Sequence, residues 1–146
     1  MSGPIRIGDL IPHQGTMCLL DGVVFWTRES IRCRARSHLT PDNPLRRAGR
    51  LAAVCGIEYG LQAAALHGAL SANAGRQAPG YLASLRGVAI AADWLDDPAI
   101  GVLDVEASLV LREAAGLIYR FHLRAEDGRT LVSGRAMIAL PGVEAA

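Results

Sequence analysis

Hydrophobic and polar positions alternate along several stretches of the chain. In Ile31–Ser37, arginine occupies every second position and smaller or apolar residues occupy the others. Alternation with a period of two is typical of a strand in an antiparallel sheet with one exposed face. Upstream, Leu19–Thr27 is rich in bulky and β-branched residues. That composition predicts a strand buried on both faces.

The second half of the chain predicts four more strands, at Tyr81–Ile90, Val102–Arg112, Leu117–Arg124 and Thr130–Leu140. Apolar residues fall on one face of each of the last three. In the first of these three, the residues expected to point inward are Leu103, Val105, Ala107, Leu109 and Leu111. Short connections that end in glycine separate the strands, which is typical of hairpins.

Between the two groups of strands lies Leu51–Leu70, an apolar stretch rich in Ala and Gly whose only formal charge is Glu58. It predicts one long helix. The stretch is long enough to span a bilayer, but Glu58, Gln62, His67 and three glycines favour a helix surrounded by protein. An antiparallel sheet curved around this helix satisfies every segment. We therefore expect an α+β hotdog fold over residues 1–146 as one domain, with an open sheet edge that pairs in a dimer.

Composition excludes several kinds of function. Apolar residues make up 51% of the chain, charged residues 20%, and the net charge is +1, so no general field attracts nucleic acid. The sequence contains no lysine, which excludes Schiff-base chemistry, pyridoxal phosphate attachment and a P-loop. Three widely spaced cysteines and an N-terminus without an apolar signal core predict a cytoplasmic protein with neither disulfides nor a zinc site. No cofactor is expected.

Glu58 is the leading candidate for a catalytic acid. A carboxylate in an apolar helix is costly unless it is paired or kept neutral. A helix that begins at Leu51 would place Glu58 beyond the first turn, where desolvation helps a carboxyl group keep its proton. Gln62 lies one turn later on the same face. We expect it to hydrogen-bond the carboxyl group or a water, to fix the rotamer of Glu58 and to be a substrate-binding residue. The alternative is a glutamate on a solvated stripe.

Three segments resemble a known family, the hotdog 3-hydroxyacyl-acyl-carrier-protein dehydratases. They are Ile11–Val23, with Pro-His followed by Leu-Leu-Asp, the helix motif Gly56–Ala65, and the closing strand Val132–Leu140. The helix motif Gly-Ile-Glu-Tyr is most similar to the predicted dehydratases of aryl-polyene pigment clusters. The resemblance implies dehydration of a 3-hydroxyacyl thioester to the 2-enoyl thioester, in fatty-acid or polyene-type biosynthesis. The acyl group would arrive on an acyl carrier protein or on coenzyme A.

The second catalytic group does not follow from the family motif. In the housekeeping dehydratases a histidine lies in a His-Phe-Pro-Gly-His-Pro loop, and that position here is Pro44. The resemblance places the Pro-His loop beside the acyl tunnel, which makes His13 the candidate partner of Glu58. For His38 a structural or surface role is expected, for His67 a place near the helix C-terminus, and for His122 a solvated face.

Three arginines in the loop before the helix, Arg46, Arg47 and Arg50, form a candidate docking site for a phosphopantetheine arm or an acidic carrier protein. The alternative is a solvated run of charge. Two other functions remain open on the same fold. One is an acyl-thioesterase, and the other is a non-catalytic acyl-binding subunit, which the missing loop histidine favours. The expected assembly is a homodimer, with a heterodimer or a higher oligomer as the alternatives.

Overall fold

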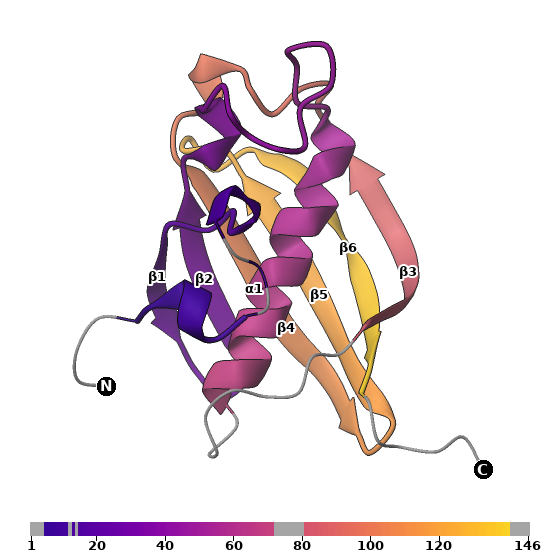
Figure 1. Cartoon of the computed structure of the whole chain (residues 1–146). Coiled ribbons are helices and arrows are strands. Elements are labelled where there is room, and N and C mark those ends of the chain that lie inside the picture. The colour runs from indigo at the N-terminus through magenta and orange to yellow at the C-terminus, as the bar shows by residue number, and fades with distance from the viewer. Residues whose placement is uncertain (1–4, 12, 14, 72–80, 141–146) are drawn as a thin grey trace.

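The computed structural model describes residues 5–11, 13, 15–71 and 81–140. Six strands form one antiparallel sheet that curves around a single helix, α1 (Figure 1). The strands are β1 Gly22–Trp26, β2 Ser30–Ala35, β3 Tyr81–Ile90, β4 Leu103–Glu113, β5 Gly116–Arg124 and β6 Thr130–Ala139. Their order across the sheet is β1-β2-β4-β5-β6-β3. The predicted α+β architecture is confirmed.

The alternating pattern predicted the central strands correctly. On β5 the inward residues Leu117, Tyr119, Phe121 and Leu123 are all buried. On β4 the pattern fails at one end, because a bulge between Leu109 and Leu111 shifts the register against β5. Leu111, which was expected to point inward, is therefore 45% exposed. One extra residue in a strand moves every later side chain relative to its partner strand.

The helix is shorter than the apolar stretch predicted. α1 spans Gly56–Ser71 and follows a 3-10 turn, η4, at Ala53–Cys55. The chain at the start of η4 pairs with the segment that follows β3. The Ala53 N–H donates to the Asp93 carbonyl at 3.0 Å, and the Leu95 N–H donates to the Leu51 carbonyl at 2.9 Å. Among the described residues, no helix is long and apolar enough to cross a membrane.

Glycine on α1 lets the helix pack closely on the sheet, as the sequence predicted. A Cβ atom added at Gly60 would lie 2.6 Å from the Phe121 ring, and one at Gly56 would lie 2.9 Å from a Leu123 methyl group. Real Cβ contacts are longer than this. Backbone of the helix therefore lies directly on side chains of β5.

The two edge strands are more exposed than the strands between them. β1 was expected to be buried on both faces, and this was wrong: it is an edge strand in which Val24 is 42% and Phe25 49% exposed. The buried part of the predicted segment, Leu19 and Leu20, precedes the strand. At the other edge, most of β3 is exposed. Its exposed apolar side chains are Tyr81, Leu82, Val88 and Ile90.

Candidate active site

Glu58 and His13 lie side by side, although 45 positions separate them in the chain (58 − 13). Glu58 is on the first turn of α1. His13 lies between two 3-10 turns, η1 at Ile7–Asp9 and η2 at Gly15–Met17. The His13 Nε2 atom is 3.3 Å from the Glu58 Oε1 atom, and the two side chains are 26% and 34% exposed. The fold thus brings together the two residues that sequence reasoning selected as an acid–base pair.

The surroundings of Glu58 differ from the expected ones. Because α1 begins at Gly56, Glu58 lies in the first turn, where the helix dipole favours a negative charge. A third of its side chain is exposed, so deep burial in an apolar helix does not describe this carboxyl group. Its nearest partner is an imidazole. The reactivity of the Glu58 carboxyl group therefore depends on His13 and on whether a bound molecule shields the two side chains from water.

Gln62 contacts backbone and not the carboxyl group of Glu58. Its side chain is completely buried. Its Oε1 atom accepts from the Leu19 N–H at 2.9 Å, and its Nε2 atom donates to the Met17 carbonyl at 2.7 Å. In the described part of the chain, no hydrogen bond joins Gln62 to Glu58. The expectation that Gln62 fixes the Glu58 rotamer is wrong, because both ends of its amide are used elsewhere.

Two other histidines are structural. His38 is fully buried with its Nε2 atom 2.8 Å from the Gly101 carbonyl. His67, expected near the end of the helix, is also fully buried: Nδ1 is 2.7 Å from the Tyr119 hydroxyl and Nε2 is 2.8 Å from the Thr27 carbonyl. Burial lowers the pKa of both imidazoles. His122, expected on a solvated face, is half-buried on β5.

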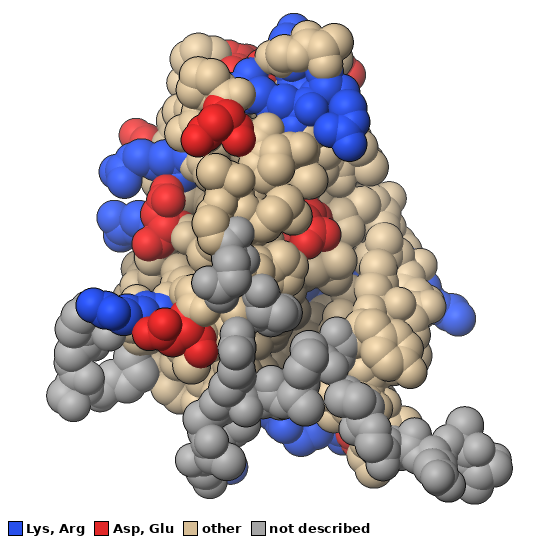
Figure 2. All heavy atoms as spheres, viewed as in Figure 1, with Lys and Arg blue, Asp and Glu red and all other residues tan. Residues whose placement is uncertain are grey.

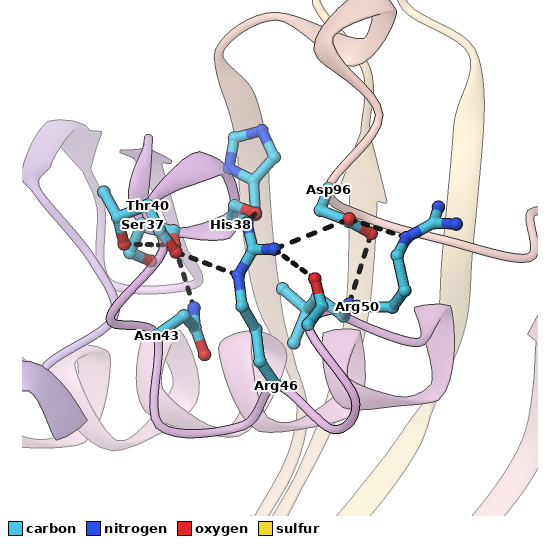
Figure 3. Close-up of polar contacts among 9 residues, drawn as sticks. Ser37, His38, Thr40, Asn43, Arg46, Arg50 and Asp96 are labelled. Atoms are coloured by element: carbon cyan, nitrogen blue, oxygen red, sulfur yellow. Dashed lines mark hydrogen bonds and ion pairs between the residues drawn. The ribbon is translucent and has the colours of Figure 1, made fainter.

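Arg46 is an internal clamp and not a free cation (Figure 3). Its side chain is 16% exposed. Its Nε atom donates to the Thr40 carbonyl at 2.9 Å, its Nη1 atom donates to the Gly49 carbonyl at 2.8 Å, and Asp96 lies 3.6 Å away. These contacts tie the loop before α1 together. Sequence alone did not single out Asp96, because nothing local pairs it with an arginine fifty positions earlier (96 − 46).

The other two arginines of the cluster are more accessible. Arg50 pairs with Asp96 at 2.8 Å and lies over the Trp94 ring at 4.1 Å from its centroid, yet 46% of its side chain is exposed. Arg47 is exposed. Figure 2 shows basic side chains gathered at the end of the molecule where α1 begins. Among the described residues, no group of three or more His, Cys, Asp or Glu side chains is placed to hold a metal ion.

Comparison with known proteins identifies the family. The profile of the ApeP-like dehydratases matches residues 5–145. The chain belongs to the ApeP-like dehydratase family. Family membership makes it a lyase and confirms the reaction class predicted from the sequence, dehydration of a 3-hydroxyacyl thioester. No curated protein sequence matches the chain.

Solved structures of a dehydratase and of thioesterases share the fold of this chain. The dehydratase heterocomplex ApeI:P from Xenorhabdus doucetiae matches with a TM-score of 0.82 at 21% identity, over 97% of this chain and 93% of that chain. Thioesterase HI1161 from Haemophilus influenzae matches with a TM-score of 0.60 at 9% identity, over 81% and 76%. A hypothetical thioesterase with coenzyme A from Streptococcus pneumoniae has a TM-score of 0.60 at 12% identity, over 84% and 87%. The hotdog fold is confirmed.

Proposed function

We propose that this ApeP-like dehydratase uses His13 as the base and Glu58 as the acid that remove water from a 3-hydroxyacyl thioester. The observation that carries the proposal is the 3.3 Å contact between the two side chains. They come from two segments that share no secondary structure, and they meet at the helix that carries the family motif. The histidine missing at Pro44 had favoured a non-catalytic subunit. His13 supplies an imidazole beside Glu58 without it.

The chemistry needs two groups that reach neighbouring carbon atoms. A neutral imidazole takes the proton from C2, next to the thioester carbonyl, and the electron pair of that bond forms the C2=C3 double bond. The C3–O bond breaks, and the hydroxide leaves as water with the proton of Glu58. His13 is then protonated and Glu58 is ionised. Because the two atoms are 3.3 Å apart, the proton returns from imidazolium to carboxylate and restores the pair.

Water must be excluded for the pair to start in its neutral form. Both side chains are only partly exposed, so an acyl chain lying against them would remove much of their remaining contact with water. A site without water favours the uncharged acid and base over the ion pair. The proposed reaction therefore requires a substrate that covers both side chains.

The test is the formation of 2-enoyl thioester from a 3-hydroxyacyl thioester by variants of the two residues. Glu58→Gln and His13→Ala should each lower kcat by about 10²-fold or more, the usual contribution of a positioned acid or base. Matched controls are Glu113→Gln and His122→Ala, which change the same residue types on the sheet. Normal rates in Glu58→Gln or His13→Ala would refute the assignment. Release of free thiol in place of the enoyl product would indicate a thioesterase.

We further propose that a second hotdog subunit pairs along β3. This strand is an open sheet edge with exposed apolar side chains, and the segment that follows it pairs with the residues just before α1. The C-terminal end of β3 therefore lies at the same end of the helix as Glu58, and a subunit paired along β3 would reach that end. The matching ApeI:P structure is a heterocomplex, which supports a different dehydratase-type chain as the partner, with a second copy of this chain as the alternative.

The mass in solution tests this assembly. Val88→Lys places a charge on the exposed β3 edge and should convert a dimer to a monomer and lower activity. Val24→Lys makes the same change on the opposite edge strand and should leave the assembly intact. The measurement is light scattering of the chain alone and mixed with a candidate hotdog partner. A dimer that persists in Val88→Lys would contradict the proposed interface.

For delivery of the substrate, we propose an acyl carrier protein that docks on Arg47 and Arg50. Arg46 is withdrawn from the predicted docking site because internal carbonyls bind it. Arg47→Glu should lower kcat/KM for a carrier-linked substrate and leave a coenzyme A thioester little affected. Arg120→Glu, an equal charge change on the exposed face of β5, is the control. Equal loss with both substrates, or no loss, would exclude docking at these arginines.

A further inference from the structure

Both backbone groups of Leu19 are hydrogen-bonded to side chains. One of these side chains lies on α1, and the other is itself hydrogen-bonded to a residue of α1. The Leu19 N–H donates to Gln62 Oε1 at 2.9 Å, and the Leu19 carbonyl accepts from the Ser37 hydroxyl at 2.7 Å. Ser37 Oγ is also 2.7 Å from the Tyr59 hydroxyl. Because the single hydroxyl proton of Ser37 goes to Leu19, Tyr59 is the donor to Ser37. Gln62 adds a bond to the Met17 carbonyl at 2.7 Å.

These bonds determine where the segment before β1 lies. The described residues from His13 to Leu20 belong to no strand, so no sheet ladder fixes them. Within the described part of the chain, the buried Nδ1 atom of His13 has no hydrogen-bond partner, so the ring is not oriented from that side. Gln62 joins this segment to α1 one turn after Glu58. Because Gln62 and Glu58 lie on one helix, the bonds to Met17 and Leu19 anchor the segment that carries His13 to the turn of α1 next to Glu58.

We infer that Gln62 is a positioning residue that places His13 against Glu58 through the backbone of Met17 and Leu19. The inference rests on the proposed acid–base pair. It gives the residues of the helix motif separate tasks: Glu58 acts on the substrate, while Tyr59 and Gln62 hold the segment that carries its partner. A misplacement of about 1 Å between reacting groups lowers rates by about 10²-fold. Loss of the hydrogen bonds from Gln62 to Met17 and Leu19 should therefore lower kcat.

A merely structural role would also lower stability, so the experiment needs a readout specific to His13. Gln62→Met keeps the length and volume of the side chain and removes both hydrogen bonds. We expect kcat to fall by about 10-fold to 10²-fold with KM little changed. In a His13→Ala background the same substitution should cause no further loss, because there is no imidazole left to misplace.

Tyr119→Phe is the matched control. It removes a buried hydrogen bond between the sheet and the same helix, at His67, without touching Met17 or Leu19. It should lower the free energy of unfolding and leave kcat unchanged. If Gln62→Met does not fold, Ser37→Ala, which removes the hydrogen bond to the Leu19 carbonyl, carries the same comparison with and without His13.

The outcomes separate the two proposals. An unchanged rate in His13→Ala would refute the acid–base pair itself, and the positioning role with it. The positioning role alone would be refuted by a different pair of results. His13→Ala would lower kcat as expected, but the Gln62 substitution would cause the same loss in the native and the His13→Ala background. A normal kcat in Gln62→Met would also refute the positioning role alone.

Discussion

Close packing of α1 on the sheet depends on glycine at position 60. An added Cβ atom there would lie 2.6 Å from Phe121 Cδ1, 2.7 Å from Cγ and 2.9 Å from Cβ. Rotation of the ring does not relieve the last two contacts, because Cβ and Cγ are near the backbone of β5. Gly60→Ala therefore forces the helix away from the sheet or strains both.

Two opposing effects determine the magnitude. Alanine favours a helix over glycine by about 1 kcal/mol, and overpacking a core costs about 1–3 kcal/mol. With three contacts at or below 2.9 Å, the upper end of that cost applies. We expect Gly60→Ala to lower the free energy of unfolding by about 2 kcal/mol, the difference between ~3 and ~1. Gly56→Ala should cost less, because its two shortest contacts, at 2.9 and 3.0 Å, are with methyl groups of Leu123 and Val132.

Urea unfolding at a fixed protomer concentration measures the effect, since assembly couples stability to concentration. In a Phe121→Ala background, which removes Cγ and the ring and leaves only the Cβ contact, the cost of Gly60→Ala should shrink. The account would be wrong if Gly60→Ala were as stable as the native protein, or if its cost were the same with and without the ring.

Two further outcomes follow from the backbone and from the buried histidines. Ala48 has a φ of 52°, a left-handed conformation that strains alanine, and Gly49 after it has a φ of 75°. Ala48→Gly should therefore raise the free energy of unfolding by up to about 1 kcal/mol and move the urea midpoint upward. A lower midpoint would contradict the strain. Burial lowers the pKa of His38 and His67 below 6.5, so the unfolded chain binds more protons as pH falls through that region. Stability should drop between about pH 7 and about pH 5, by at most about 1.4 kcal/mol per pH unit for each histidine; urea midpoints that stay level or rise would refute this.

Most of the fold could be predicted because alternation reports burial directly. β2 and β5 have one face buried throughout, and their patterns located them correctly. The predictions failed where buried residues lie outside a strand or where a strand is exposed. Leu19 and Leu20 are buried without being in a strand, while the strand that follows is an exposed edge. The apolar stretch from Leu51 begins as a β-like pairing before the helix starts, and hydrophobicity does not distinguish the two.

Part of the site could be predicted for the same reason. Glu58 stood out as a single charge in an apolar stretch, and His13 through a family resemblance. Their proximity depends on tertiary contacts that have no local pattern, namely the bonds from Gln62 to Met17 and Leu19. Likewise, Arg46 looked like a surface cation because its partners are backbone carbonyls, which every residue carries and no sequence pattern marks.

The most direct measurement is deuterium incorporation during the reverse reaction in D₂O, with the chain alone and mixed with a candidate hotdog partner. Protonated His13 should deliver a deuteron to C2 of a 2-enoyl thioester while Glu58 assists the addition of water at C3. The native protein should form 3-hydroxyacyl product carrying one deuterium at C2. His13→Ala and Glu58→Gln should each form this product at a rate lower by about 10²-fold or more. Native rates of labelled product in either variant would contradict the central claim that these two side chains move the protons.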